Sequence, residues 1–187
     1  MSIVVAVTKH DRTVMAADTQ SSFGTKVLPQ DNHATTKIRR VGNSLLGRVG
    51  WGIYENILDE VLAQRDPPGL DDAPQIFRFF TDLWKVLHKR YSFVNDQAKH
   101  KGSPFGDLGG SFVVANRQGI FYVAPNLGVS RFKQYYAIGT GADFSLGALH
   151  QLYDQQDDVE QIARAAVQTA EAFNVNCGGE IESLEVP

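Results

Sequence analysis

The chain has 187 residues, of which 43% are hydrophobic and 21% are charged, a balance typical of globular proteins. Its formal net charge of -3 gives no electrostatic reason to expect nucleic acid or an anionic membrane as a partner. No run approaches the ~20 apolar residues of a membrane span, and the apolar stretch at 3–7 is too short for a signal peptide.

Strand patterns dominate the N-terminal quarter of the chain. Residues 3–7 and 13–17 are two apolar runs on either side of a polar turn, which predicts a β-hairpin. The polar stretch 21–32 contains Gly24 and Pro29, so we expect a loop or an irregular strand pair there. Two further short strands are predicted at 36–41 and 44–49.

Helical periodicity begins after these strands. Apolar residues recur at steps of three and four from Ile53 to Leu62, which predicts a helix that ends at the proline-containing stretch 66–69. A second helix is expected to start near Asp72, which is acidic and lies just before Pro74, and to extend into the low 90s. A loop is predicted for 101–110.

A second block of strands and helices completes the chain. It comprises strands at 111–115, 119–123 and 135–138, a helix with Leu146, Leu149 and Tyr153 facing inward, and a strand at 181–186. A further helix is expected over 159–170, after the acidic residues Asp157 and Asp158. This order of strands, two helices, strands, two helices and a strand favours antiparallel sheets with helices on their outer faces, an α+β class. With no linker or internal repeat, we expect a single domain over 1–187.

The common motifs for cofactors, metals and nucleophiles are absent from the sequence. There is no nucleophile elbow, P-loop or H-E-x-x-H motif, and we expect no cofactor. None of the five histidines has metal-ligand spacing, so each is interpreted as a surface or structural residue: His10, His33, His88, His100 and His150. The single cysteine, Cys177, excludes an internal disulfide and fits a reducing compartment.

Six short stretches carry the strongest functional signal. Ser2 begins the first strand, and Asp18 ends the second strand sixteen residues later. The other four are, in chain order, a basic strand that opens at Lys37, Gly47 in the following strand, 136–141 and 174–179. Together they resemble the proteasome β-subunit family and its simpler bacterial relatives, HslV and other proteasome-like peptidases.

The resemblance extends over essentially the whole chain. The matching family motifs are a first strand TTIVAV, a strand end A-A/G-D, a strand K-I/V-x-R, an oxyanion-binding glycine, A-I-G-S-G and D-x-x-S-G-G. The resemblance implies the fold of the N-terminal-nucleophile hydrolases, a four-layer αββα sandwich of two antiparallel sheets flanked by helices.

The resemblance also implies a role for four residues. Ser2 would become the nucleophile after removal of Met1, and its α-amine, with a pKa of about 8, would take the hydroxyl proton. Lys37 would lower the pKa of the hydroxyl, and Asp18 would keep Lys37 charged and in position. The amide of Gly47 would stabilise the oxyanion. Taken singly, Asp18 and Lys37 are ordinary strand-end and strand-face residues, and it is the joint spacing that favours the site.

The sequence departs from the family pattern at the nucleophile and at three supporting positions. The usual threonine is Ser2, which lacks the β-branch that restricts χ1. The two supporting serines correspond to Thr140 and Cys177, and the supporting aspartate corresponds to Asn174. Asn174 can form hydrogen bonds but brings no negative charge to hold a protonated amine.

These observations predict a cytoplasmic, self-compartmentalising peptidase that acts on peptides or unfolded proteins. By analogy with relatives, the chain would form a homo-oligomer of two stacked rings, twelve or fourteen subunits in all. The second predicted helix carries more aromatic area than one inward face needs, which would suit such an interface: Phe77, Phe79, Phe80 and Trp84 beside Ile76. The sequence does not indicate any ATPase regulator. Two alternatives remain, a catalytically silent ring or scaffold protein and a small-molecule amidase of the same fold.

Overall fold

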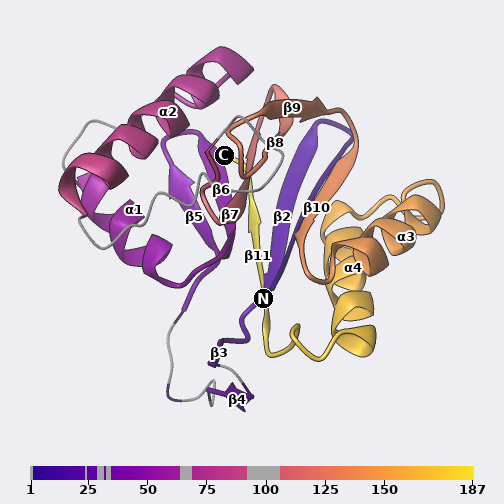
Figure 1. Ribbon diagram of the computed structural model, residues 1–187. Coiled ribbons are helices and arrows are strands. Elements are labelled where there is room, and N and C mark those ends of the chain that lie inside the picture. The colour runs from indigo at the N-terminus through magenta and orange to yellow at the C-terminus, as the bar shows by residue number, and fades with distance from the viewer. Residues whose placement is uncertain (1, 24, 29–31, 33–34, 64–68, 92–105) are drawn as a thin grey trace.

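Two antiparallel sheets stack face to face in the computed structural model, which describes residues 2–23, 25–28, 32, 35–63, 69–91 and 106–187. Helices α1 (Ile53–Ala63) and α2 (Ala73–Arg90) lie on one outer side, and α3 (Ala142–Leu152) and α4 (Val159–Phe173) on the other (Figure 1). The predicted four-layer αββα sandwich is therefore confirmed.

In both sheets each strand pairs with its neighbours in the antiparallel direction. The first has the order β10-β1-β2-β11, with β10 Tyr135–Gly139, β1 Ile3–Lys9, β2 Arg12–Asp18 and β11 Ile181–Glu185. The second has the order β5-β6-β7-β8-β9, with β5 Ile38–Val41, β6 Ser44–Gly50, β7 Gly110–Asn116, β8 Gly119–Val123 and β9 Val129–Phe132. A separate short pair, β3 (Ser22–Phe23) and β4 (Lys26–Val27), matches the expected irregular strand pair.

Strand β1 is buried on both faces because its side chains alternate between two apolar layers. Ile3, Val5 and Val7 pack in the layer formed with α3 and α4. Val4 and Ala6 pack between the two sheets, together with residues of β2, β6, β7 and β8. A shift of one residue in register would exchange these two sets of side chains, so burial on both faces fixes where the strand begins.

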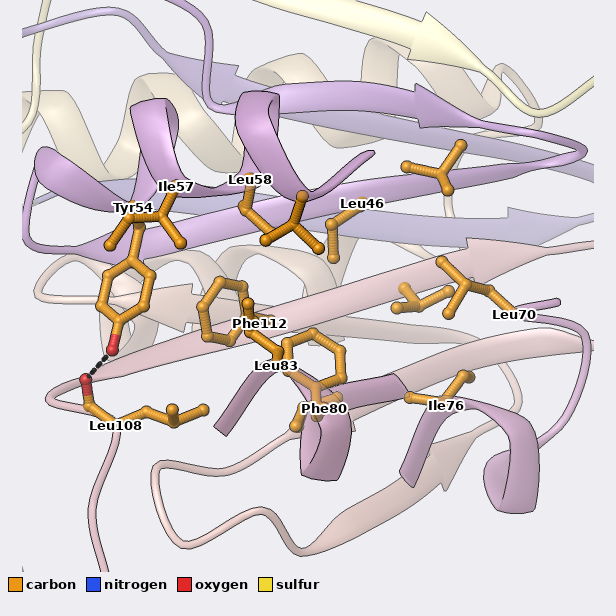
Figure 2. Close-up of a cluster of buried hydrophobic side chains, with 14 of the residues drawn as sticks. Leu46, Tyr54, Ile57, Leu58, Leu70, Ile76, Phe80, Leu83, Leu108 and Phe112 are labelled. Carbon is orange, nitrogen blue, oxygen red and sulfur yellow. Dashed lines mark hydrogen bonds between the residues drawn. The ribbon is translucent and has the colours of Figure 1, made fainter. Parts of the chain in front are cut away.

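A third apolar layer lies beneath α1 and α2. Figure 2 shows Phe80 of α2 beside Phe112 of β7, with their ring centroids 4.8 Å apart. Tyr54 of α1 meets Phe112 edge-on and donates a hydrogen bond from its hydroxyl to the carbonyl of Leu108. The layer is therefore a packed aromatic core rather than an open cleft.

The helix starts follow the signals expected from the sequence. Asp72 caps α2, where its Oδ1 accepts from the Gln75 amide (2.8 Å), and Pro74 occupies the first turn. Asp158 caps α4 and accepts from the amides of Glu160 and Gln161. Each cap satisfies amides that have no partner within the helix.

The structure differs from the sequence expectations in two elements. Strand β9 was not predicted, because its side chains are half-buried or exposed and show no apolar alternation. In α1 the residue that packs inward at the first turn is Tyr54, and Ile53 is exposed. Met1, Gly24, Pro29, His33, His100, the helix break at 66–68 and the part of the expected loop at 101–105 lie outside the described residues.

The aromatic residues of α2 belong largely to the core. Phe80 is fully buried, and Phe79 and Trp84 pack against the same apolar layer. Phe77 alone of the four is largely exposed, at 51%. The aromatic excess therefore gives less support to an interface than the sequence suggested.

Within the described ranges, no helix is both long and apolar enough to cross a lipid bilayer.

Truncating Phe80 tests the core beneath α2. Because Phe80 is fully buried against Phe112, Phe80→Ala should lower the free energy of unfolding by about 3–5 kcal/mol. On the exposed side of the same helix, Phe77→Ala should change it by less than about 1 kcal/mol. Urea titration of both variants measures the difference, and equal losses would contradict the described packing.

Candidate active site

Ser2 lies at the N-terminal end of β1, at the wall of a pocket. The pocket has a volume of about 560 Å³, and its other lining residues include Gly50, Tyr122, Tyr136, Gly139 and Thr140. Ser2 itself is 6% exposed. A serine at the wall of a cavity of this size can meet a bound ligand.

Gly139 holds the end of β10 against Ser2. The two strands pair with Ile3 opposite Gly139. Gly139 has φ +114°, and a Cβ at this position would lie only 2.0 Å from the Ser2 carbonyl oxygen. Glycine is therefore required there, both for the backbone conformation and for the close approach.

A buried ion pair lies next to this strand end. Lys37 Nζ lies 2.6 Å from Asp18 Oδ1, with the side chains 5% and 0% exposed. The same carboxylate oxygen accepts from the Ile3 amide (2.9 Å), and Lys37 also donates to the Gln20 carbonyl (2.9 Å). The Ser2–Ile3 peptide is therefore tied directly to the Asp18–Lys37 pair, and the structure brings these three predicted residues together.

Burial lowers the pKa of Lys37, because the ammonium form loses hydration. The negative charge of Asp18 and its hydrogen bond oppose this shift, and the positive charge of Arg48 adds to it. A lysine with a depressed pKa exchanges a proton more readily near neutral pH than a solvated one. The pair can therefore influence a neighbouring hydroxyl by its charge and by hydrogen bonding.

The loop after α4 closes the other side of the ion pair. The Gly178 amide donates to Asp18 Oδ2 (3.2 Å), and the Gln20 amide donates to the Gly178 carbonyl (2.8 Å). Cys177 is buried in this loop. Burial, and to a smaller extent the negative charge of Asp18, raises the pKa of its thiol to about 11. Cys177 is therefore a neutral thiol at physiological pH.

The three supporting positions that depart from the family pattern lie together. Asn174 ends α4, and its Nδ2 donates to the Thr140 carbonyl (2.6 Å). A hydrogen bond from Thr140 acts to lower the pKa of Cys177 against the larger effect of burial. Thr140 also lines the pocket beside Ser2. Thr140, Asn174 and Cys177 thus form one polar cluster next to the pocket.

Gly47 does not lie at the pocket. The Arg48 amide donates to the Lys37 carbonyl (3.0 Å) and so faces β5. Because successive amides of a strand point to opposite edges, the Gly47 amide faces β7, where its partner is Val113. A Cβ at Gly47 would lie 2.7 Å from Val4 Cγ1 and 2.9 Å from Val113 Cγ1, so its α-carbon faces the space between the sheets.

Gly50, three residues later, is the glycine of β6 that lines the pocket with Ser2. By the same alternation its amide faces the edge of β6 that Arg48 shares with Lys37, beyond the end of β5. Gly50 was not predicted as a site residue from the sequence. The signal that could have revealed it is its place at the end of the strand, where a backbone amide can leave the ladder.

Among the residues that the structure describes, no group of three or more histidine, cysteine, aspartate or glutamate side chains could hold a metal ion. The histidines in those ranges make local contacts instead. His88 contacts the Trp84 carbonyl, and His10 contacts Asp157.

Comparisons with known proteins agree on one group of relatives. No protein-family model matches the chain. The ATP-dependent protease subunit HslV of Hyphomonas neptunium (strain ATCC 15444) is 28% identical over 192 residues, which cover 98% of this chain and 92% of the relative.

Solved structures extend this likeness to three dimensions. Thiobacillus denitrificans BPH in complex with epoxomicin is 31% identical, with a TM-score of 0.89 over 98% of this chain and 97% of its own. A second structure of Thiobacillus denitrificans BPH is 31% identical, with a TM-score of 0.88 over 98% of this chain and 96% of its own. Eukaryotic HslV from Trypanosoma brucei, at 19% identity and a TM-score of 0.67 over 98% of both chains, shares the fold.

Gly47→Ala tests the position of Gly47 inside the sandwich. The added methyl group would collide with Val4, Met15 and Val113, so the free energy of unfolding should fall by about 1–3 kcal/mol. Gly147, in α3, has nothing within 4 Å of an added Cβ, so Gly147→Ala should raise it by up to about 1 kcal/mol. Chemical denaturation measures both. An unchanged or more stable Gly47→Ala protein would show that this glycine is not packed as described.

Proposed function

Because the chain belongs to the proteasome β-subunit family, which includes HslV, we propose that it is a peptidase that cleaves peptide bonds with Ser2 as its N-terminal nucleophile. The observation that carries this proposal is the contact of the Ser2–Ile3 peptide with the buried Asp18–Lys37 pair at the wall of a pocket. A serine hydroxyl is a weak nucleophile until a base and a charged neighbour activate it. In this proposal Lys37 is the charged neighbour and the α-amine of trimmed Ser2 is the base.

The first chemical step would be acyl transfer to Ser2. Removal of Met1 frees the α-amine, which takes the proton from the Ser2 hydroxyl while Oγ attacks the substrate carbonyl carbon. The protonated amine then gives its proton to the leaving amide nitrogen as the carbon–nitrogen bond breaks. Water, deprotonated by the same amine, then attacks the carbonyl carbon of the resulting ester. The carbon–Oγ bond breaks, the protonated amine returns the proton to Oγ, and the second product leaves as a carboxylic acid.

Lys37 and Gly50 would act on the charges that develop in these steps. The ammonium of Lys37, fixed by Asp18, favours the alkoxide form of the Ser2 hydroxyl. The negative charge on the substrate oxygen requires a backbone amide at the pocket wall. Gly50 fits this role better than Gly47, since Gly50 lines the pocket and Gly47 is enclosed between the sheets.

The polar cluster of Thr140, Asn174 and Cys177 would position the amine. Asn174 is bonded to the Thr140 carbonyl and therefore holds the pocket wall in place. The neutral thiol of Cys177 is unsuited to act as a second nucleophile, because its pKa is raised to about 11. We propose that Cys177 fills space beside Gly141. A Cβ added to Gly141 would lie only 2.8 Å from the Cys177 Sγ.

Substrates and assembly follow from the relatives. We expect peptides or unfolded proteins as substrates, and epoxomicin, which binds the BPH relative, as an inhibitor of this chain. The HslV relative is a subunit of an ATP-dependent protease, so a homo-oligomer of two stacked rings, with twelve or fourteen subunits, is proposed here too. Confinement inside such rings would supply the selectivity that an open pocket lacks.

Two other functions are distinguishable from this one. A silent ring protein would keep the fold without cleaving peptides, and the substitution of asparagine for the family's aspartate at 174 is the feature that favours it. A small-molecule amidase would use the same nucleophile in a pocket of about 560 Å³, a volume within the range for small ligands. A measurement of peptide cleavage distinguishes these two functions from the peptidase, because only the peptidase is expected to cleave peptides.

Replacing the nucleophile tests the proposal most directly. Ser2→Ala should abolish cleavage of short fluorogenic peptides, and Lys37→Ala should lower kcat/KM by about a hundredfold or more. Mass spectrometry should show loss of Met1 and, with epoxomicin, one inhibitor bound to each wild-type chain but none to Ser2→Ala. A matched form with an untrimmable extension before Ser2 should fold equally well and be inactive. Wild-type rates in Ser2→Ala would disprove the assignment.

The oligomer is tested separately. At micromolar concentration, mass photometry should find a species of twelve or fourteen chains. A monomer or dimer would remove the argument for a closed chamber and would favour the amidase.

A further inference from the structure

Glu171 is a carboxylate of α4 to which no role has been given so far. Its Oε1 is buried and accepts no hydrogen bond within the part of the chain that the structure describes. A buried carboxylate oxygen without a donor is costly, so its retention calls for an explanation.

The last turn of α4, which carries Glu171, lies near the start of β1. A Cβ added to Gly141 would lie 2.7 Å from the Cβ of Ala170, the residue before Glu171. It would also lie 2.8 Å from Cys177 Sγ and 3.4 Å from Ile3 Cβ. The final turn of α4 therefore packs against the first residue of β1. Glu171 is close enough to interact electrostatically with three titratable groups, namely Asp18 from β2, Lys37 from the segment before β5 and Cys177 from the loop after α4.

The Ser2 nitrogen lies near one of these groups, the Asp18 carboxylate. The Ile3 amide lies 2.9 Å from Asp18 Oδ1, and consecutive backbone nitrogens are about 3–3.5 Å apart. The nitrogen that becomes the α-amine therefore lies no more than about 6.5 Å from the Asp18 carboxylate.

The charges of this cluster do not balance. Asp18 and Glu171 are two carboxylates, Lys37 is one ammonium and Cys177 is a neutral thiol. The positive charge of Arg48, which also acts on Lys37, is already paired with Glu55 (2.7 Å). Burial raises the pKa of Glu171 and the charge of Asp18 raises it further, while Lys37 lowers it. A second positive charge would remove the imbalance, and the protonated α-amine of a trimmed Ser2 provides one.

We propose that Glu171 is a positioning residue that holds the α-ammonium group of Ser2, and that it supplies the negative charge that Asn174 does not. The inference rests on the proposed function for the identity of the amine. Glu171 lies in α4, about one helical turn before Asn174, the position where the family has its aspartate. Glu171 does not contact the substrate, and it acts through the amine.

The expected effect on pH dependence has a definite sign. The neutral amine is the base, so kcat/KM rises with pH as the amine loses its proton. A neighbouring carboxylate favours the ammonium form and raises the pKa of the amine. Glu171→Gln should therefore lower that pKa by about one unit and shift the rising limb of the profile to lower pH. The plateau of kcat/KM should fall about tenfold, since the ammonium formed during acylation loses its partner.

The experiment measures the amine itself as well as the reaction. The rate at which acetic anhydride acetylates the trimmed N-terminus, followed by mass spectrometry across pH, reports the pKa of the Ser2 amine. Wild type is compared with Glu171→Gln, Glu171→Asp and the double variant Glu171→Gln/Asn174→Asp. Asp154→Asn, which removes an exposed carboxylate at the end of α3, is the matched control.

Glu171→Asp should retain most of the amine pKa, and Asn174→Asp should restore it in the Glu171→Gln background. The Asp154→Asn control should leave it unchanged. An amine pKa that is the same in wild type and in folded Glu171→Gln overturns the inference. A wild type that cleaves no peptide would remove the proposed function, whereas the acetylation profile would still decide whether Glu171 holds the amine.

Discussion

The buried ion pair of Lys37 and Asp18 is the interaction on which the rest of the site depends. Two charges removed from water are tolerated only when their remaining hydrogen-bonding capacity is met. Here the Ile3 and Gly178 amides donate to the Asp18 carboxylate, and Lys37 donates to the Gln20 carbonyl. Four segments distant in sequence are therefore held in one place by one pair. Loss of either charge would leave the other unpaired in the interior, so the pair is a structural requirement as well as a chemical one.

The pair also explains how a chain terminus can be an ordered site. Terminal residues are usually loose because few contacts hold them. Here the strand that follows Ser2 lies between β10 and β2, and its side chains are buried on both faces. The register is set by two apolar layers, and the end of the strand is fixed by Asp18 and by the close approach of Gly139. Serine lacks the χ1 restriction of threonine, so this backbone constraint carries more of the orientation.

Much of this arrangement could be predicted because it depends on local patterns. The two apolar runs on either side of a polar turn predicted β1 and β2, and acidic capping residues predicted the starts of α2 and α4. The spacing of Ser2, Asp18 and Lys37 identified residues that the structure does bring together. Gly47 and Gly50 could not be separated in this way, since both are glycines of one strand and only the direction of their amides distinguishes them. Glu171 was missed because its significance comes from groups on β2 and before β5.

Charge balance links the maturation of the terminus to its chemistry. Two carboxylates and one lysine leave the described cluster one positive charge short, and the α-amine of Ser2 can provide that charge only when no residue precedes it. A preceding residue would turn this nitrogen into an uncharged amide, which can donate a hydrogen bond but cannot accept a proton. The same event would then create the base and complete the electrostatics that hold it. On this argument the replacement of an aspartate by Asn174 does not by itself silence the site, because Glu171 on the same helix keeps the count of negative charges.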